Sequence, residues 1–394
     1  MKRSNATLCI ELSCCLLIAQ LALAQAKPRA RDLGVPFEGT PGPLNAITDV
    51  KGVEVGLTTI ISGEGPLKVG AGPVRTGVTA VLPRGKDSPD PVFAAWFSIN
   101  GNGEMTGTTW IEEGGFLEGP VFITNTHSVG TVRDAAIMWA VRHGKMQQPW
   151  ALPVVAETYD GGLNDINGFH VKPEHVFKAL DGASSGPVAE GNVGGGTAMS
   201  CYGFKCGTGT ASRKVSDSMG NYTVGVLVQA NHGGRNQLRV AGVPVGAEMS
   251  QPAQGAPRGS GNSGEHELGS IIIVVATDAP LAPHQLKRIA HRATHGLGRT
   301  GATSGNGSGD IVIAFSTANP GAAAAADTVQ VSMVSNQRIS ALFDATAQAT
   351  EEAIINALVA GETMVGANGR TVQAMPHDRL KEILKKYNRL NESK

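Results

Sequence analysis

Two serines stand at the starts of strongly apolar runs in this sequence. Ser270 follows Gly269 and begins SIIIVVATD, and Ser308 precedes IVIAFSTA. Both runs are rich in β-branched residues and are typical of buried strands. The residues before the first run, 251–269, are rich in Gly, Pro and Ser, so we expect a flexible linker that ends at the Gly269-Ser270 step.

The Gly269-Ser270 step offers a chemistry that an ordinary internal serine lacks. A serine hydroxyl barely ionises near neutral pH and needs an adjacent base to act as a nucleophile. If the chain is cut between these residues, Ser270 gains a free α-amine with a pKa of about 8, which can accept the proton of its own hydroxyl. Gly269 suits such a cut because it adds little bulk and allows unusual backbone geometries. The residues alone therefore allow two interpretations, an ordinary surface loop that enters a core strand, or self-cleavage that creates a catalytic N-terminus.

Other polar residues follow predicted strands, where side chains can reach a pocket. Glu157, Tyr159 and Asp160 come at the end of the run 151–161, and Asn231 ends the run YTVGVLVQAN, with His232 next to it.

Composition indicates a globular protein. The chain has 394 residues, 41% apolar and 17% charged, and Lys plus Arg equal Asp plus Glu at 33 each. Such a chain can bury a large core. The balanced charge argues against nucleic acid or an anionic membrane as the main partner.

The order of apolar patterns favours an α+β layered sandwich over a doubly wound sheet. We expect strands over GVTAVLP, PVFAAWFSI, GTTWI and GPVFITN between residues 44 and 124, then over 151–161, 222–231, 270–278 and 311–318. We expect helices over 128–143, from Pro173, over 283–295 and 339–359, and over 378–390.

The first 26 residues resemble a secretory signal peptide. Lys2 and Arg3 precede an apolar stretch, and cleavage after Ala24 or Ala26 fits the small-residue pattern. A secreted or periplasmic protein is expected, and no later stretch is long enough to span a bilayer. The mature chain would keep only Cys201 and Cys206, which either pair or stay reduced.

Cofactor and metal motifs are weak. GNVGGGTAM lacks the GK[ST] ending of a phosphate loop, and its glycines instead suit a close backbone approach. His291 and His295 lie at helical spacing without the acid that a metalloprotease needs, and Cys201 and Cys206 have no nearby zinc ligands. We therefore expect no metal and no cofactor.

Six stretches, in order, carry a resemblance to a known family. They are NGNGEMTG, ETYDG with LND, GNVGGGTAM with CYGFK, VLVQANHG, GSIIIVVATDAPL with PHQLKR, and GLGRTG with SGDIVIAFSTAN. Together the sequence resembles the DmpA/BapA family of bacterial L-aminopeptidase/D-esterases and β-peptidyl aminopeptidases over about residues 32–390. The resemblance implies an αββα four-layered fold. It also implies a precursor that processes itself into an α-chain, here 27–269, and a β-chain, here 270–394.

The resemblance also implies roles for individual residues. Ser270 matches the N-terminal nucleophile, and Ser308 matches a serine hydrogen-bonded near it. Asn231 matches an oxyanion-hole amide, Tyr159 a tyrosine lining the site, and Glu157 the acid that receives the substrate ammonium group. Glu104, in the first motif, either supports this pocket or closes a glycine turn.

Three positions depart from the family pattern. Asp310, which we place with the catalytic residues, stands where β-peptide-cleaving relatives tend to have glutamate. Leu57 replaces an early histidine, which we interpret as a packing change, and Cys206 replaces a small residue. The departure at Asp310 bears on substrate preference more than on reaction type.

Two rivals stay open from sequence. One is an acyltransferase of the ornithine acetyltransferase type, and the other is an uncleaved, non-catalytic periplasmic binding protein. For the leading hypothesis, the substrates are small peptides, amides or esters with a free amino group, with L-α-, β- and D-amino types all open. An oligomer of processed αβ units, a tetramer by analogy, is expected.

Overall fold

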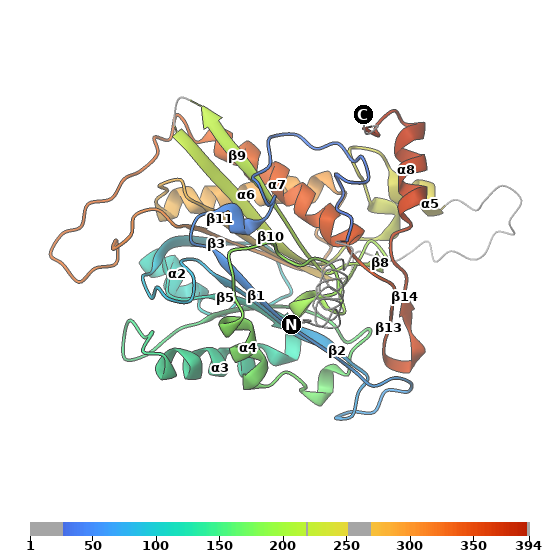
Figure 1. The fold of residues 1–394 in the computed structure, drawn as a ribbon, viewed down its shortest axis with the longest axis horizontal. Helices are drawn as coiled ribbons and strands as arrows, with labels where there is room; N and C mark the ends of the chain where they lie inside the picture. Colours follow the sequence, from blue (N-terminus) through green and yellow to red (C-terminus); the bar gives the residue numbers. More distant parts are fainter. Residues whose placement is uncertain (1–26, 218–219, 251–268, 392–394) are drawn as a thin grey trace, which may run out of the picture.

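The computed structural model describes residues 27–217, 220–250 and 269–391. The predicted signal peptide, with its three cysteines, and residues 251–268 of the predicted linker lie outside this described part of the chain. The architecture is mixed α+β, as the sequence predicts, with two sheets packed face to face between helices (Figure 1).

The first sheet has four strands in the order β1-β2-β5-β6. Its outer face is covered by α3 and α4, which pack against it through a cluster that includes Val78, Phe122 and Val176. The elements of this half are β1 (Glu54–Ser62), β2 (Val74–Leu82), β5 (Val121–Asn125), β6 (Val154–Thr158), α3 (Val129–Arg142) and α4 (Pro173–Asp181).

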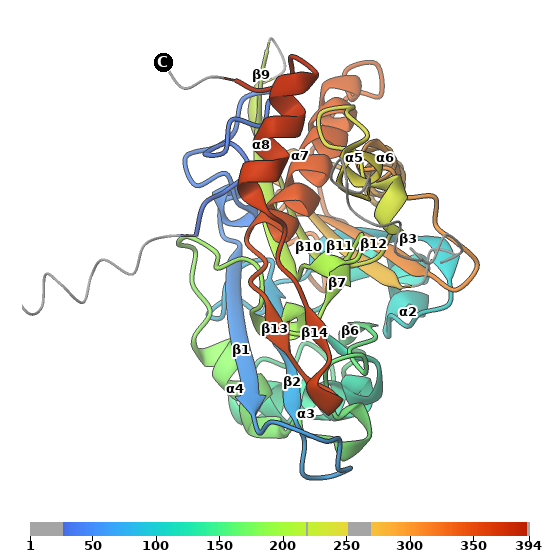
Figure 2. The same cartoon turned by 90° about the vertical axis from the view of Figure 1, so that its right-hand side faces the viewer.

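The second sheet has six strands in the order β4-β3-β12-β11-β10-β9, and α6 and α7 cover its outer face. Its elements are β3 (Val92–Gly101), β4 (Phe116–Leu117), β9 (Thr208–Asp217), β10 (Gly220–Asn231), β11 (Ser270–Thr277), β12 (Gly309–Ser316), α6 (Pro283–Arg299) and α7 (Ser340–Val359). The layers thus follow the order helices, sheet, sheet, helices (Figures 1 and 2).

Strand β11 shows why its residues are apolar without alternation. Ile271 and Ile273 face the helices α6 and α7, whereas Ile272 and Val274 face the other sheet. Side chains alternate along a strand, and here both faces are buried, so the residues between Ser270 and Thr277 are all apolar. β11 is therefore a rigid support for Ser270, its first residue.

The remaining elements are short. They are α2 (Thr108–Gly114), β7 (Ser200–Cys201), β8 (Phe204–Lys205), α5 (Val245–Ser250), β13 (Met364–Val365), β14 (Thr371–Val372) and α8 (His377–Lys386), with 3₁₀ turns at Ile47–Asp49, Thr126–Ser128, Ile166–Gly168, Gly194–Gly196, Arg235–Gln237 and Ala367–Gly369.

The strand predicted over GTTWI is wrong, because this stretch forms the helix α2. Gly107 and Gly115 flank the helix with φ angles of 72° and 74°, and the Gly115 amide donates to the Ile111 carbonyl at 2.9 Å. Only Ile111 of the helix is buried. The β-branched residues favoured a strand, but left-handed glycines at both ends close the helix.

The glycine-rich stretch 191–196 packs closely against its neighbours, as predicted. A β carbon on Gly195 would lie 2.2 Å from Gln229 Oε1, and one on Gly196 would lie 2.4 Å from the Thr208 amide nitrogen. Leu57 is partly buried against the core between the sheets, which agrees with its interpretation as a packing residue. The glycines of residues 191–196 therefore allow this loop to lie against both sheets.

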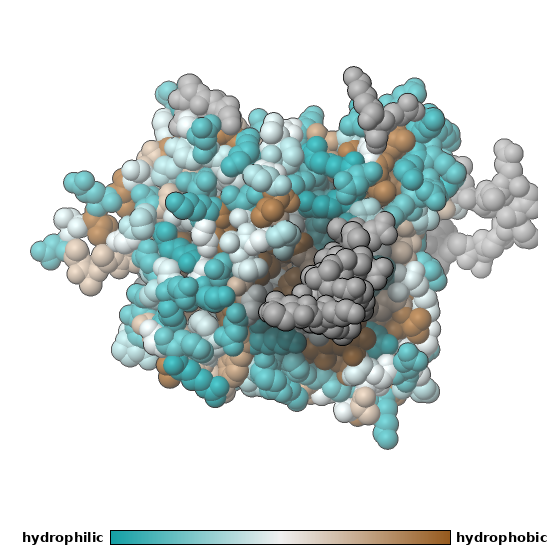
Figure 3. Space-filling model, viewed as in Figure 1, coloured by the Kyte–Doolittle hydropathy of each residue, from teal (hydrophilic) through white to brown (hydrophobic). Residues whose placement is uncertain are grey.

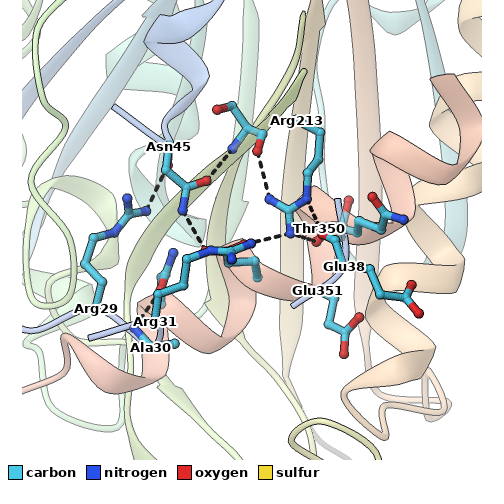
Figure 4. Close-up of polar contacts among 12 residues, drawn as sticks. Arg29, Ala30, Arg31, Glu38, Asn45, Arg213, Thr350 and Glu351 are labelled. Atoms are coloured by element: carbon cyan, nitrogen blue, oxygen red, sulfur yellow. Dashed lines mark hydrogen bonds and ion pairs between the residues drawn. The ribbon is translucent and has the colours of Figure 1, made fainter. Parts of the chain in front are cut away.

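A buried charged cluster fixes the N-terminal segment to α7. Glu352 is fully buried and accepts hydrogen bonds from Arg31 at 2.8 Å and from Asn45 at 2.6 Å, and it pairs with Arg213 at 2.7 Å. Burial alone would raise the pKa of Glu352, but the Arg31 hydrogen bonds and the two guanidinium charges outweigh it and hold this pKa below its usual value. Figure 4 shows Arg31 and Arg213 reaching this cluster from two sides.

The surface is mixed in character. On the face drawn in Figure 3, hydrophobic residues form several small groups among hydrophilic ones. Within the described residues, none of the helices combines the length and hydropathy that a membrane span requires.

Candidate active site

Strand pairing brings the predicted site residues together. Ser270 begins β11 and lies opposite Asn231, the last residue of β10, in the antiparallel register. On its other side β11 runs parallel to β12, where Ile271 is level with Asp310. Ser270, Asn231 and the segment 308–310 therefore meet at one edge of the six-stranded sheet.

Gly269 is the residue that both backbone and space demand before Ser270. Its φ angle is 122°, a region that L-residues rarely adopt, and a β carbon there would lie 2.0 Å from the Asn231 carbonyl oxygen. The residue directly before Ser270 thus has a conformation that only glycine supplies.

The Ser270 hydroxyl accepts a hydrogen bond from the Gly309 amide at 3.2 Å, and Ser270 is 6% exposed. The Ser308 hydroxyl donates to Asp310 Oδ1 at 2.5 Å, and the same oxygen accepts the Ile271 amide at 3.2 Å. With Ser270 still joined to Gly269, its hydroxyl is therefore bound to the backbone beside Ser308 rather than to Ser308 itself.

Asp310 is fully buried, and burial raises the pKa of its carboxyl group, while hydrogen bonds from Ser308, Ser304 and the Ile271 amide oppose the rise. Its bond to the Ile271 amide also ties it to the backbone next to Ser270. The shorter side chain at this position therefore still reaches both the serine at 308 and the nucleophile strand.

The Asn231 side chain has a fixed orientation. Its Oδ1 accepts the Ser200 amide at 2.9 Å, and its Nδ2 donates to the Tyr159 carbonyl at 3.0 Å. A primary amide has two N–H groups, so one remains for a further acceptor. The side chain lines the cavity beside Ser270, where such a donor can meet a developing negative charge.

Glu157, the last residue but one of β6, is a buried carboxylate, 4% exposed, on the wall of the same cavity. It accepts the Glu104 amide at 3.1 Å and the Thr126 hydroxyl. Burial raises its pKa, and these two hydrogen bonds oppose the rise. Glu104 thus supports the pocket through its backbone, which settles a question that the sequence leaves open.

Tyr159 is 55% exposed and lines the cavity. Its ring lies against Gly161, where a β carbon would be 2.4 Å from the phenol oxygen. Its carbonyl group, rather than its ring, holds Asn231. The Tyr159 carbonyl therefore orients Asn231, and Tyr159 also forms part of the cavity wall.

These residues enclose a cavity of about 510 Å³. Glu157, Tyr159, Asn231, Gly269, Ser270 and Arg370 all line it. A cavity of this size suits a small organic ligand. Of the residues predicted to act in catalysis or substrate binding, Ser270, Asn231, Glu157 and Tyr159 line the cavity, whereas Ser308 and Asp310 do not.

A disulfide joins Cys201 and Cys206, with an S–S distance of 2.05 Å. It closes the short hairpin β7–β8, in which Ser200 pairs with Lys205. This hairpin holds the end of β10 twice, through the Ser200 amide on Asn231 and through the Tyr202 amide on the His232 carbonyl at 2.8 Å. Cys201 and Cys206 are therefore paired rather than reduced. The disulfide supports the hairpin that orients the Asn231 side chain, the predicted oxyanion-hole donor.

The sequence places Asp160 at a strand end without giving it a role in the site, and it does not mark Arg370 at all. Asp160 is buried, and burial raises its pKa to about 7 against hydrogen bonds from Thr76, Asn164 and Asn125. Its position among the polar residues 157–160, at the end of a predicted strand, could have identified Asp160 as a site residue. Arg370 comes from the hairpin β13–β14, and no motif marks it.

Metal ligands do not gather in the part of the chain that the structure describes. No group of three or more His, Cys, Asp or Glu there is placed to hold an ion. His291, one residue of the HxxxH pair on α6, packs its ring against Phe97 with centroids 3.8 Å apart. That contact accounts for His291 as a packing residue.

A two-sheet α+β sandwich with a Gly-Ser step at the start of a central strand, beside a cavity with a buried carboxylate, is the arrangement expected of a serine hydrolase of the N-terminal-nucleophile class. The chain matches Peptidase family S58 over residues 45–372 and belongs to that family.

Similar proteins cover nearly the whole chain. The chain is 58% identical to beta-peptidyl aminopeptidase BapA of Sphingosinicella microcystinivorans, over 96% of this chain and 97% of that protein. It is 51% identical to the protein of the same name from Sphingosinicella xenopeptidilytica, over 94% of each. The solved structure of an L-aminopeptidase D-Ala-esterase/amidase from Ochrobactrum anthropi, described as a prototype for serine aminopeptidases and a new variant of the Ntn hydrolase fold, is 51% identical. It superposes with a TM-score of 0.84, covering 92% of this chain and 100% of the other.

Proposed function

We propose that this chain is a self-processing serine aminopeptidase that releases β-amino and small L-amino residues from the N-termini of short peptides and related amides. The observation that carries the proposal is the Gly269-Ser270 step, held beside a cavity whose wall presents the buried carboxylate of Glu157. The beta-peptidyl aminopeptidases at 58% and 51% identity support β-amino substrates.

Processing would begin with the Ser270 hydroxyl, whose oxygen attacks the Gly269 carbonyl carbon. The Gly269–Ser270 C–N bond breaks as the acyl group moves to oxygen, and the Ser270 nitrogen takes the proton. Water then hydrolyses the ester, which leaves a Gly269 carboxylate and a Ser270 α-amine. The Gly309 amide, 3.2 Å from the hydroxyl oxygen, supports this attack by stabilising the developing alkoxide.

Catalysis by the processed enzyme would use the same oxygen. The Ser270 α-amine takes the hydroxyl proton, and the oxygen attacks the carbonyl carbon of the substrate's first residue. The free N–H of Asn231 binds the oxyanion, and Glu157 holds the substrate ammonium group. The leaving amine receives the proton, and water then hydrolyses the acyl-enzyme. Ser308 and Asp310 would hold Ser270 in place from behind.

Export and assembly extend the proposal. A signal peptide over residues 1–26, an α-chain of 27–269 and a β-chain of 270–394 would yield a processed enzyme in the periplasm or medium, where a disulfide such as Cys201–Cys206 persists. We also propose an oligomer of αβ units, which size-exclusion chromatography with light scattering measures directly.

Hydrolysis of β-alanine and L-alanine p-nitroanilides by the purified enzyme tests the activity. The proposal requires release of nitroaniline from the free-amine compounds and little from their N-acetyl forms. Equal rates on free and acetylated compounds would show that the enzyme is not an aminopeptidase.

A further inference from the structure

Arg370 places an unpaired positive charge at the cavity that contains Ser270. The side chain is exposed and lines this cavity, with Val372 as its neighbour on the hairpin β13–β14. Its guanidinium group forms no hydrogen bond or ion pair with any described residue. Arginine donors with no protein partner at the mouth of a binding cavity are free to bind an anion.

The hairpin that carries Arg370 is held in place at several points. The Ala367 amide donates to the Leu163 carbonyl at 2.8 Å, and buried Arg75 donates from Nε to the Val365 carbonyl at 2.9 Å. Within the turn, the Gly366 amide donates to the Arg370 carbonyl at 2.9 Å. Figure 2 shows the hairpin as an extended ribbon alongside the body of the molecule. Arg370 therefore projects from a supported turn.

The guanidinium group of Arg370 lies close to Gly162 on the cavity wall. A β carbon on Gly162 would lie 3.5 Å from Arg370 Nη1, which is ordinary contact distance. The guanidinium group thus lies beside the 159–163 segment, whose Tyr159 carbonyl holds Asn231. The cation is close to the wall of the site and belongs to its lining.

The two charged groups that line the cavity come from different elements. Glu157 is held by the Glu104 amide and the Thr126 hydroxyl, whereas Arg370 lies with Gly162 and Val372. They form no ion pair with each other. The second acid of the cavity, Asp160, accepts a hydrogen bond from Asn164 at 3.0 Å and forms no ion pair with Arg370. The cavity therefore offers a negative and a positive group that remain separate.

We propose that Arg370 binds the C-terminal carboxylate of the substrate, so that the enzyme prefers free dipeptides and similarly short peptides to amidated or longer ones. This inference rests on the proposed function, because it takes Glu157 as the partner of the substrate ammonium group. A dipeptide carries an ammonium and a carboxylate on either side of one scissile bond. A cavity of about 510 Å³ holds a molecule of that size.

In this scheme Arg370 acts on binding rather than on the chemical step. The scissile C–N bond breaks, the acyl group stays on Ser270, and the leaving amine takes the proton and departs with its carboxylate intact. Because the carboxylate has the same charge before and after the step, its contact with Arg370 stabilises ground state and transition state alike. Such uniform binding lowers KM and leaves kcat unchanged.

The test compares three substrates, which are β-alanyl-L-alanine, its C-terminal amide and β-alanine p-nitroanilide. Only the first has a free carboxylate. In the Arg370→Gln enzyme we expect kcat/KM for the free acid to fall about tenfold through a higher KM, which corresponds to about 1.4 kcal/mol. The amide and the p-nitroanilide should be hydrolysed at unchanged rates. Arg370→Lys, which keeps the charge but not the planar fork, should fall between the two.

Arg389→Gln is the matched control, because Arg389 is exposed and does not line the cavity. It should leave all three substrates unaffected. An equal loss on all three substrates in Arg370→Gln would mean a structural role and overturn the proposal, as would an unchanged rate on the free acid. A wild-type enzyme that does not hydrolyse β-alanine p-nitroanilide would instead refute the proposed function itself.

Discussion

Replacement of Glu157 by glutamine should remove the recognition of the substrate ammonium group while leaving the fold intact. The carboxylate accepts one hydrogen bond on each oxygen, from the Glu104 amide and from the Thr126 hydroxyl. A glutamine oxygen can accept the first bond. Its NH₂ group can donate to the Thr126 hydroxyl, which can also act as an acceptor. The substitution therefore changes charge more than packing.

The expected loss follows from the burial of this carboxylate. Glu157 is 4% exposed, so its interaction with an ammonium group is poorly screened by solvent. A hydrogen bond to a charged partner contributes about 1.5–3 kcal/mol, which corresponds to about a ten- to hundredfold loss of kcat/KM. The loss should appear on β-alanine p-nitroanilide and not on processing at residue 269, which involves no ammonium group.

The pH profile gives a second readout of Glu157. The ionised carboxylate is the form that binds an ammonium group, and burial raises the pKa of Glu157, so its contribution is lost as pH falls through a value above that of an ordinary glutamate. The Ser270 α-amine must also be neutral, with a pKa of about 8. In the wild type, log kcat/KM should steepen from slope one to slope two on the acid side. In Glu157→Gln the slope should stay at one across the acid side, because the carboxylate that takes up the second proton is absent.

Glu113→Gln is the control, because Glu113 is exposed on α2 and does not line the cavity. It should keep near wild-type kcat/KM. The reasoning would be refuted by a Glu157→Gln enzyme that is processed normally and hydrolyses β-alanine p-nitroanilide at the wild-type rate.

We make three further predictions about the residues that form or support the site. Gly269→Ala should block processing, because its β carbon would meet the Asn231 carbonyl, whereas Gly242→Ala, at φ 79° with open space, should be processed normally; a gel of both variants decides. Replacing Cys201 and Cys206 by alanine should lower the free energy of unfolding by about 2 kcal/mol, as measured by denaturant unfolding. It should also reduce kcat, because the hairpin that orients the Asn231 side chain is loosened, and an unchanged kcat would show that the disulfide does not support Asn231. The pKa of Asp160 is raised to about 7, so the native state binds more protons than the unfolded chain between about pH 4 and pH 7, and stability declines as pH rises through that range. Asp160→Asn should therefore gain in melting temperature over the wild type from pH 4 to pH 7, and a constant difference would contradict the assignment.

The apolar patterns of the sequence located most of the core. The run SIIIVVATD could be assigned to a buried strand because both of its faces are covered, and α7 was found from its helical spacing. GTTWI was misassigned because its end glycines, rather than its β-branched residues, decide its conformation. β9 was missed because Arg213 and its polar neighbours do not resemble a strand. The structure buries Arg213 by pairing it with Glu352 and by hydrogen bonds from its guanidinium group to backbone carbonyls.

Some features of the candidate site could also be predicted from the sequence, whereas others could not. Ser270, Asn231 and Glu157 were predicted by family resemblance, and the strand register explains why they meet. The Ser200 amide that orients Asn231 and the Gly309 amide on Ser270 are backbone groups, which no side-chain pattern reveals. Arg370 reaches the cavity from a hairpin about a hundred residues later in the sequence than Ser270, a contact that depends on tertiary packing.

The central claim is that Ser270 cuts the chain before itself and then serves as the nucleophile. Intact-mass spectrometry of the purified wild-type protein and of Ser270→Ala tests it most directly. The wild type should give two chains whose masses place the break between Gly269 and Ser270, and Ser270→Ala should give one uncut chain without activity. A wild-type protein that hydrolyses β-alanine p-nitroanilide as a single chain, or a Ser270→Ala protein that still splits at this bond, would contradict it.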